Sequence, residues 1–464
     1  MIKESRQLEV TADGGFEIDA VTAFEQVVGA IDELHKKCGE RAQAAQYGAI
    51  SSFWHSIVGV DQNSEPTTKL FAWAETRPAV HVARLRHDLH EPEIHNRTGC
   101  PFHSSYWPAK ILWIKESFPE KFEITSKWLS FSDFLGQKMF GSRDTSISMA
   151  SGTGIFDIRK QQWDMELVEY LGLAPENLPV ISGDDSPVHS FINEYRERWP
   201  GIAGSKWFPA IGDGAANNIG AGCLTKSKAA LMIGTSGAMR VAYEGEPPVE
   251  IPHGLWCYRI DKKRVVIGGA LSDGGGLYRW LKDNLGLSEH DNETERMIAA
   301  RKPAAHGLTF LPFLAGERST GYNDFATGAV FGLRTATDKI DIVQAAFEAV
   351  AYRFADVFTR LRSVLEIEEI IASGGALRES PVWTQIICDV IGRDMSLPAT
   401  REASSRGVVL LASLKTGFID DVGKPDQTGA VEFSHNPSHR DAYDRAMKQQ
   451  LNLYAKLVER KQGA

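Results

Sequence analysis

The sequence lacks the marks of several classes of protein. It has five cysteines and no C-x-x-C pair, which indicates free thiols in a reducing cytosol rather than a disulfide framework. No apolar run approaches the ~20 residues of a membrane helix, and the polar start has no apolar signal core. A formal net charge of −9 argues against nucleic acid or an anionic membrane as the main partner. We therefore expect a cytoplasmic globular protein.

Two common nucleotide-binding motifs are also missing. Residues 212–223 read GDGAANNIGAGC, and residues 231–240 read LMIGTSGAMR. Neither stretch is followed by Gly-Lys-Ser/Thr, as a P-loop would be, and neither fits G-x-G-x-x-G. What is present instead is one aspartate close to two runs of small residues.

A length of 464 residues predicts at least two domains, because single hydrophobic cores stop growing well below it. Both halves mix strand and helix patterns, so we expect an α/β protein with two lobes, at 1–222 and 223–464. The expected elements include a helix capped by Asp19, an apolar hairpin at 229–243, a long helix at 340–365 and a strand–turn–helix at 368–392. Residues 146–164 read as two extended pieces around Gly152 and Gly154.

Three places in these elements are candidates for chemistry, and each has an ordinary alternative. Asp213 could take a proton from a hydroxyl that attacks a phosphoryl group, or it could cap a helix. The turn at 234–237 could hold phosphate oxygens with its N–H groups, or it could only close a hairpin. Gly374 and Gly375 could let a flat ligand approach the backbone, or they could form an ordinary strand–helix connection.

Together these stretches resemble the FGGY family of carbohydrate kinases. GAVFGLRTATDKIDIVQAAFE (328–348) is similar to the C-terminal signature of that family, and KILW (110–113) to the core of its N-terminal signature. FLAGERSTGYNDFATG, SGGALRESPVWTQIICDVIG and EASSRGVVLLASL also resemble family sequence, so the resemblance covers most of the chain. TGCPFHSSYWPAK, SMASGTGIFD, MIGTSGAMR and AGERS look like the gluconate-kinase branch.

The resemblance implies a fold, cofactors and residue roles. The fold would be the two-lobed actin/hexokinase-like (ribonuclease-H-like) ATPase fold with an interdomain cleft. ATP and Mg²⁺ would be required, and the substrate would be a sugar or a sugar acid such as gluconate. Asp213 would be the catalytic base. The residues implied for nucleotide binding are Gly234, Thr235, Ser236, Gly237, Gly374, Gly375, Ala376, Gln385, Glu402 and Ala403.

For the sugar, the resemblance implies contacts from Asp213, His55, Glu75 and Arg77. Glu75 and Arg77 belong to WAETR, where the family has W-x-D-x-R, so Glu75 replaces the usual aspartate with a longer side chain. His55 has the alternative of a partly buried histidine satisfied by backbone groups. Trp54, Trp73 and Tyr106 are interpreted as packing residues rather than sugar platforms.

One feature of the family is absent. The family begins with a β-hairpin that carries D-x-G-T-[ST], whose aspartate helps position the metal and whose turn binds phosphate. This sequence has no such motif, and TADGGFEID (11–19) is the nearest stretch. We therefore expect unpaired sheet edges in the N-terminal lobe and poor catalysis by residues 1–464.

Two hypotheses stay open. One is a sugar kinase whose true start lies upstream, acting as a monomer or homodimer. The other is a catalytically impaired relative that binds sugar or nucleotide in a regulatory role.

Overall fold

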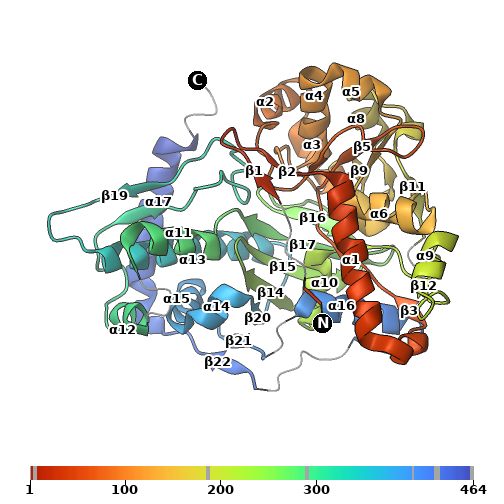
Figure 1. Cartoon of the computed structure of the whole chain (residues 1–464). Coiled ribbons are helices and arrows are strands. Elements are labelled where there is room, and N and C mark those ends of the chain that lie inside the picture. Colours follow the sequence, from red (N-terminus) through yellow and green to blue (C-terminus); the bar gives the residue numbers. More distant parts are fainter. Residues whose placement is uncertain are drawn as a thin grey trace.

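The structure is a computed structural model that describes residues 2–3, 8–183, 189–287, 292–399, 402–422 and 429–459. Figure 1 shows two lobes, with α2 (Ala79–Asp88) and α4 (Trp107–Ser117) in the lobe at upper right and α13 (Lys339–Arg362) in the lobe at left. Helices α10 (Asp213–Gly220) and α16 (Ala403–Lys415) pack against each other between the lobes.

The C-terminal lobe is built on one continuous sheet. Its inner strands contain long apolar runs, and residues 229–231 and 265–271 are buried, as expected for strands covered by helices on both faces. The strand order is β16-β17-β15-β14-β20-β21-β22. The strands are β14 (Lys228–Ile233), β15 (Gly237–Glu244), β16 (Trp256–Arg259), β17 (Arg264–Leu271), β20 (Glu369–Ser373), β21 (Met395–Leu397) and β22 (Val431–Phe433).

Helices cover this sheet because their apolar residues recur at helical spacing. In α13 the buried residues include Ile340, Val343, Phe347, Val350 and Phe354, which line one face. The other helices of the lobe are α11 (Gly275–Leu285), α12 (Asn292–Ala299), α14 (Gly375–Glu379), α15 (Pro381–Ile391) and α17 (Arg440–Leu457). A separate hairpin joins β18 (Thr309–Leu311) to β19 (Ala329–Phe331).

The N-terminal lobe has its strands in short pieces. Among the described residues the pieces are β1-β2-β6, β5-β7, β3-β12, β4-β13, β8-β11 and β9-β10. The strands are β1 (Glu9–Val10), β2 (Phe16–Ile18), β3 (Tyr47–Gly48), β4 (Ser51–Ser52), β5 (Val58–Val60), β6 (Leu70–Phe71), β7 (Lys127–Leu129), β8 (Asp144–Ser146), β9 (Phe156–Asp157), β10 (Gln162–Trp163), β11 (Val180–Ser182), β12 (Lys206–Trp207) and β13 (Ile211–Gly212).

Helices make up most of the rest of this lobe. Besides α2, α4 and α10, they are α1 (Ala20–Cys38), α3 (Glu91–Thr98), α5 (Pro119–Ile124), α6 (Phe131–Phe140), α7 (Ile147–Ser151), α8 (Met165–Tyr170) and α9 (Asn193–Arg198). Strand β4 pairs with β13 and with no other strand of the described chain. Unpaired edges are therefore present in this lobe as expected, at β4 and equally at the other strands of its two-stranded pieces.

Most of the expected elements are confirmed. Asp19 caps α1 by accepting the N–H of Thr22 at 2.8 Å. The hairpin β14–β15 and the strand–turn–helix that leads to α15 lie where the sequence predicted them. The expectation for 146–164 was wrong in its first half. Ser146 accepts the N–H of Met149 and caps the short helix α7, so extended structure begins only at β9.

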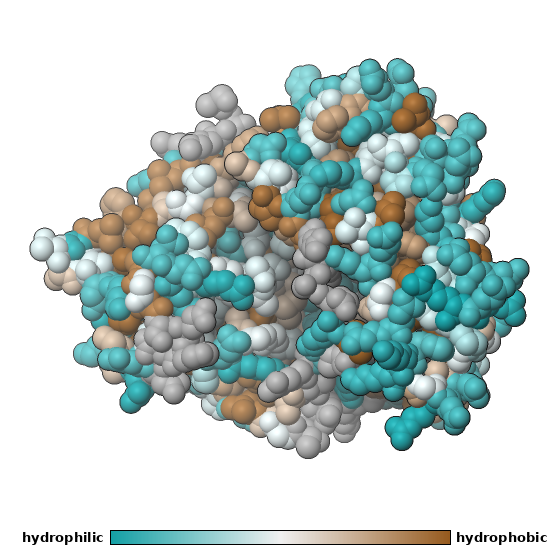
Figure 2. Space-filling model, viewed as in Figure 1, coloured by the Kyte–Doolittle hydropathy of each residue, from teal (hydrophilic) through white to brown (hydrophobic). Residues whose placement is uncertain are grey.

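Hydrophobic side chains also reach the surface. Figure 2 shows such a surface at the left of the molecule, over the β18–β19 hairpin, and both Phe331 and Leu333 are more than half exposed. None of the helices in the described ranges combines the length and the apolar character that crossing a membrane requires.

Candidate active site

Asp213 is the first residue of α10 and its side chain is exposed. The cap of this helix is Gly212, which offers no side chain, and the Asp213 carboxylate accepts the N–H of the next residue, Gly214, at 2.8 Å. The helix-cap alternative therefore does not describe this residue. Its carboxylate lies at the surface, at the start of a buried helix.

The glycines beside Asp213 make room for a protein side chain rather than for a ligand. A Cβ at Gly212 would lie 1.8 Å from Trp54 Cε2, and one at Gly214 would lie 2.8 Å from Trp54 Cζ3. Trp54 is buried and donates its indole N–H to the Ser148 carbonyl at 2.8 Å. The interpretation of Trp54 as a packing residue is thus confirmed. Its ring packs against Gly212 and Gly214, on either side of Asp213.

The turn at 234–237 joins β14 to β15 and packs on the start of α11. The carbonyl of Gly234 accepts the N–H of Gly275 at 2.8 Å, and the carbonyl of Thr235 accepts the N–H groups of Gly274 and Gly276 at 3.1 and 2.9 Å. Because these carbonyls face α11, the tip is fixed from one side only. Thr235 is exposed at this tip, so the turn is open to a ligand.

Gly374 and Gly375 follow β20 next to this turn and differ in environment. Gly374 has φ +103°, and a Cβ there would lie 2.2 Å from the Ile233 carbonyl oxygen, so glycine is required. Gly375 starts α14, is exposed, and has nothing closer than 4.0 Å around its missing Cβ. The Cβ of Ala376 lies 3.0 Å from the corresponding position on Gly275. The two glycine-rich stretches therefore meet at the carboxyl ends of the neighbouring parallel strands β14 and β20.

Three residues predicted to bind nucleotide lie elsewhere in the C-terminal lobe. The Gln385 amide nitrogen donates to Asp389 and to the Ser434 carbonyl, each at 2.8 Å. Glu402 and Ala403 stand at the start of α16, which reaches Asp213 through a 3.3 Å bond from Ser404 Oγ to the Asp213 carbonyl.

The small pocket beside the start of α16 is lined by residues from both central helices and from β20. Among them are Ala403, Pro398 and Ser373, whose hydroxyl is buried without a partner in the described chain. A polar atom left in this way is suited to bind a ligand group.

His55 has a left-handed backbone, with φ +69°. Its Nδ1 donates to the Gly152 carbonyl at 2.6 Å, and its own carbonyl accepts from Lys110 Nζ at 2.7 Å. Burial lowers the pKa of His55 to about 3, so the ring is neutral and its Nε2 is an acceptor. The backbone satisfies one ring nitrogen, as the alternative expected, while the sugar contact stays a prediction. The ring edge meets Tyr106 at 4.9 Å between centroids.

Lys110 holds this histidine segment and was not singled out from the sequence. It is fully buried in α4 and also donates to the Ala72 carbonyl at 2.8 Å. Burial lowers its pKa to about 7. The signal for it was a single charge inside the apolar run WPAKILWI.

Glu75 and Arg77 bind each other. The guanidinium donates to both Glu75 oxygens at 2.7 Å and also contacts Glu17 on β2. Glu75 further accepts the N–H of Phe16 at 3.0 Å, and the Arg77 side chain lies 4.7 Å from the ring of Trp113. All of these contacts lie within the N-terminal lobe, where they tie the β1–β2 hairpin of TADGGFEID to the segment after β6.

Two arginines with little exposure were missed by the sequence reasoning. Arg240 on β15 is buried, at 8% exposed, and Arg318, which follows the β18 strand, is half-buried. Burial lowers the pKa of Arg318, whereas the charge of Asp213 raises it, and Arg318 in turn lowers the pKa of His55. The structure therefore brings His55, Asp213 and the two arginines close enough to influence one another's pKa values. In the sequence, Arg240 is recognisable as the one charged residue of the apolar stretch GAMRVAY. Arg318 is the arginine of AGERS.

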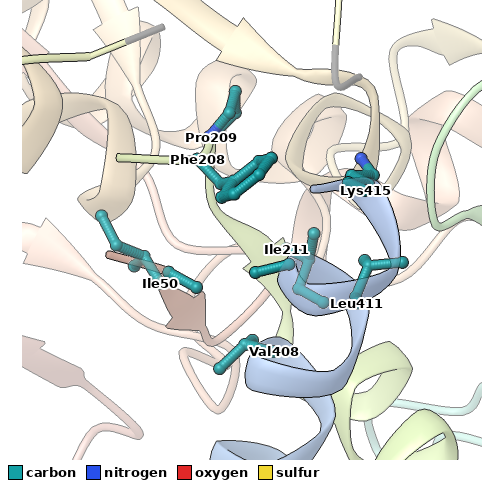
Figure 3. A pocket seen from close by; sticks show the side chains of 9 residues that line it. Ile50, Phe208, Pro209, Ile211, Val408, Leu411 and Lys415 are labelled. Carbon is teal, nitrogen blue, oxygen red and sulfur yellow. The ribbon is translucent and has the colours of Figure 1, made fainter. Parts of the chain in front are cut away.

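A different pocket lies between β4 and α16 and has no chemical groups of this kind. Figure 3 shows Ile50, Phe208, Ile211, Val408 and Leu411 pointing into it, and Lys415 at its rim. Its mainly apolar lining indicates packing. In the described part of the chain, no group of three histidine, cysteine, aspartate or glutamate residues could hold a metal ion.

Known proteins match both lobes. Residues 3–218 match the N-terminal domain of the FGGY family of carbohydrate kinases, and residues 229–416 match its C-terminal domain. Gluconokinase of Bacillus subtilis (strain 168) is 28% identical over 432 residues, which cover 89% of this chain and 82% of the relative. Glycerol kinase of Burkholderia vietnamiensis (strain G4 / LMG 22486) is 27% identical over 400 residues, covering 82% and 77%.

Solved structures agree with these matches. Gluconate kinase from Lactobacillus acidophilus superposes with a TM-score of 0.86 at 25% identity, covering 98% of this chain and 92% of that one. Ligand-bound xylulose kinase from the same species gives a TM-score of 0.88 at 24% identity with the same coverage. The expected two-lobed fold is confirmed.

Proposed function

Because the chain belongs to the FGGY family of carbohydrate kinases, we propose that it transfers the γ-phosphoryl group of ATP to a hydroxyl of a sugar acid such as gluconate. The similarity to gluconokinases supports the sugar acid over a neutral sugar. The observation that carries the proposal is an exposed carboxylate, Asp213, whose charge acts on the buried Arg240 and the half-buried Arg318. The turn 234–237, which precedes Arg240 on the same strand, is open to a ligand.

In this proposal Asp213 is the general base. Its carboxylate accepts the proton of the substrate hydroxyl while that oxygen forms a bond to the γ-phosphorus. The bond from the γ-phosphorus to the bridging oxygen breaks, and ADP leaves with that electron pair. Little covalent chemistry is required of the protein, so positioning and charge supply most of the rate.

The nucleotide is proposed to lie on the C-terminal lobe. The N–H groups at the tip of 234–237 would hold phosphate oxygens, and Gly375 and Ala376 would border the adenosine. Mg²⁺ would neutralise charge on the phosphates. Kinases hold this ion largely through substrate phosphates, and the described residues form no group of three side chains that would hold it by themselves, so the phosphates would be its main ligands.

The proposal also includes a cytoplasmic location, which the five free thiols support. Gln385, Glu402 and Ala403 are kept as proposed borders of the nucleotide site, and Glu75 and Arg77 as proposed residues of the sugar side. The assembly is proposed to be a monomer or homodimer, which sedimentation of the purified chain would test.

The test is an ADP-release assay with ATP, Mg²⁺ and a panel of aldonates, pentuloses and polyols. We expect slow release with an aldonate, because the sequence lacks the D-x-G-T-[ST] motif, and none without sugar. Calorimetry of the same sugars separates binding from turnover. Sugar binding without ADP release would favour a kinase-like binding protein. ADP release with a neutral sugar but not with an aldonate would show that the substrate is the neutral sugar.

A further inference from the structure

Arg240 is a buried cation whose side-chain donors are incompletely used. It lies on β15, where its neighbours are apolar, and its side chain is almost fully covered. Its Nε and Nη1 atoms are buried and have no hydrogen-bond partner among the described residues. Buried polar atoms are paired in the great majority of cases, because an unpaired one costs about 1–3 kcal/mol and more when charged. A ligand is therefore the natural partner.

The guanidinium lies directly beside the proposed base. A Cβ at Gly214 would lie 2.9 Å from Arg240 Nε and 2.8 Å from the ring of Trp54. The side chain thus occupies the space next to the start of α10, over the ring that supports Asp213. Trp54 in turn contacts Tyr258 at 4.9 Å between ring centroids, on the His55 side of the cleft.

A second guanidinium increases the positive charge in this cleft. Arg318 Nε is also buried without a partner in the described chain, although its Nη2 donates to the Leu271 carbonyl at 3.1 Å and its Cζ lies 4.6 Å from the ring centre of Trp73. Burial lowers the pKa of Arg240 to about 10, the charge of Asp213 opposes that change, and the charge of Arg318 adds to it. A buried and a half-buried cation thus lie near one carboxylate, and this excess of positive charge favours an anionic ligand.

Resting on the proposed kinase function, we propose that Arg240 binds the carboxylate of an aldonate substrate and so selects a sugar acid over the neutral sugar. The other available anion is the γ-phosphate. Arg240 lies three residues along β15 from the phosphate turn, about 10 Å at the rise of a strand, and its side chain contacts the Trp54 side of the cleft. This position favours the substrate carboxylate over the nucleotide.

The test compares D-gluconate with D-glucitol, which carries a hydroxymethyl group in place of the carboxylate. Both are titrated by calorimetry into the wild-type chain, Arg240→Met and Arg240→Lys. We expect the ratio of gluconate to glucitol affinity to fall about 10²-fold in Arg240→Met, because the substrate charge would lose its partner in a buried site. Arg240→Lys keeps the charge but loses the planar donors, so it should restore part of that ratio.

The ligand-free variants supply a readout that a structural role would not give. Arg240→Met removes an uncompensated buried charge, so its melting temperature should hold or rise. A large drop in melting temperature together with equal weakening of both probes would identify Arg240 as a structural residue and overturn the inference. Should Arg240→Met fail to fold, the affinity ratio of Arg240→Lys decides alone, and an unchanged ratio counts against the proposal.

The two proposals fail in different ways. If the wild-type chain releases ADP with a neutral polyol as readily as with gluconate, the kinase function is supported and the proposed role of Arg240 is wrong. If Arg240→Met weakens a non-hydrolysable ATP analogue more than gluconate, the guanidinium serves the phosphates and the inference is wrong. If the wild-type chain neither binds nor phosphorylates any sugar of the panel, both proposals are wrong.

Discussion

The two lobes differ in how their sheets are completed. The C-terminal lobe has seven strands in one sheet, and the turn 234–237, which we propose holds phosphate, lies between two central strands, β14 and β15. In the described part of the N-terminal lobe the strands form pieces of two or three, and β4 has one unpaired edge. The nucleotide side of the proposed site is thus held by a rigid frame, whereas Asp213 is held mainly by the contact of α10 with α16 and Trp54.

That helix contact explains how a fragmentary lobe still positions its carboxylate. A Cβ at Gly220 would lie 1.8 Å from the Ala403 carbonyl oxygen, and one at Gly407 would lie 1.8 Å from that of Ala216. The helices α10 and α16 therefore touch backbone to backbone, which only glycine allows. The comparison of the lobes predicts that each contributes a separable part of the activity.

The largest expected effect is on the N-terminal side. Asp213→Asn should lower turnover about 10²–10⁴-fold, which is the usual contribution of a general base. Nucleotide binding should persist, because the phosphate turn belongs to the other lobe. Steady-state ADP release and calorimetry with an ATP analogue measure the two effects. A variant that keeps more than about a tenth of the wild-type turnover would show that the base is elsewhere.

The matching change on the C-terminal side uses the two adjacent glycines. Gly374→Val places a Cβ against the Ile233 carbonyl at a positive φ, so it should destabilise the fold by about 3 kcal/mol or more. Gly375→Val meets open space, so it should change stability by less than about 1 kcal/mol while weakening ATP binding. Urea unfolding and nucleotide titration test the pair. Equal loss of sugar and ATP affinity in Gly375→Val would mean that the pocket lies elsewhere.

Stability should also depend on pH through one carboxyl in each lobe. Burial raises the pKa of Asp133, in α6, and of Asp273, before α11, from 3.8 to about 6. The folded state then holds more protons than the unfolded state between these values, so stability falls as pH rises through that window and the penalty is fully present above it.

Replacing either carboxyl with an amide should remove this penalty. Asp133→Asn and Asp273→Asn should each gain on the order of 1–2 kcal/mol at about pH 7.5 relative to about pH 5. Melting curves of both variants and the wild type at the two values of pH measure the difference. A gain that does not change with pH would show that the carboxyl is ionised in the folded protein at both values.

The sequence predicted the local elements better than the site. Asp19 and the glycine turn at 234–237 carry signals that act over a few residues, and the structure has them as expected. The surroundings of Arg240 and Trp54 were not predicted, because they are built from separate segments, such as 54, 212–214 and 240, which pattern reading cannot join. Arg77 shows the same limit. Its motif fits a sugar contact, while its visible partners are Glu17 and Glu75.

The smallest expected effect tests whether the surface of α16 that faces the N-terminal lobe beside Tyr47 is exposed to solvent. Val408 and Val409 are neighbours on α16. Val408 is 8% exposed and lines the pocket against Ile50, whereas Val409 is 60% exposed beside Tyr47 and Phe418. Val408→Ala should therefore cost about 1–2 kcal/mol, and Val409→Ser less than about 0.5 kcal/mol.

Chemical unfolding of residues 1–464 measures both variants, with Val408→Ala as the matched control for a covered position on the same helix. Serine and valine have similar helix propensities, so the Val409 difference reports burial rather than helix formation. A loss above about 1 kcal/mol at Val409 would mean that another surface covers this face of α16 in solution. If that surface is a second copy of the chain, the melting temperature of the wild type will rise with protein concentration and that of Val409→Ser will rise less.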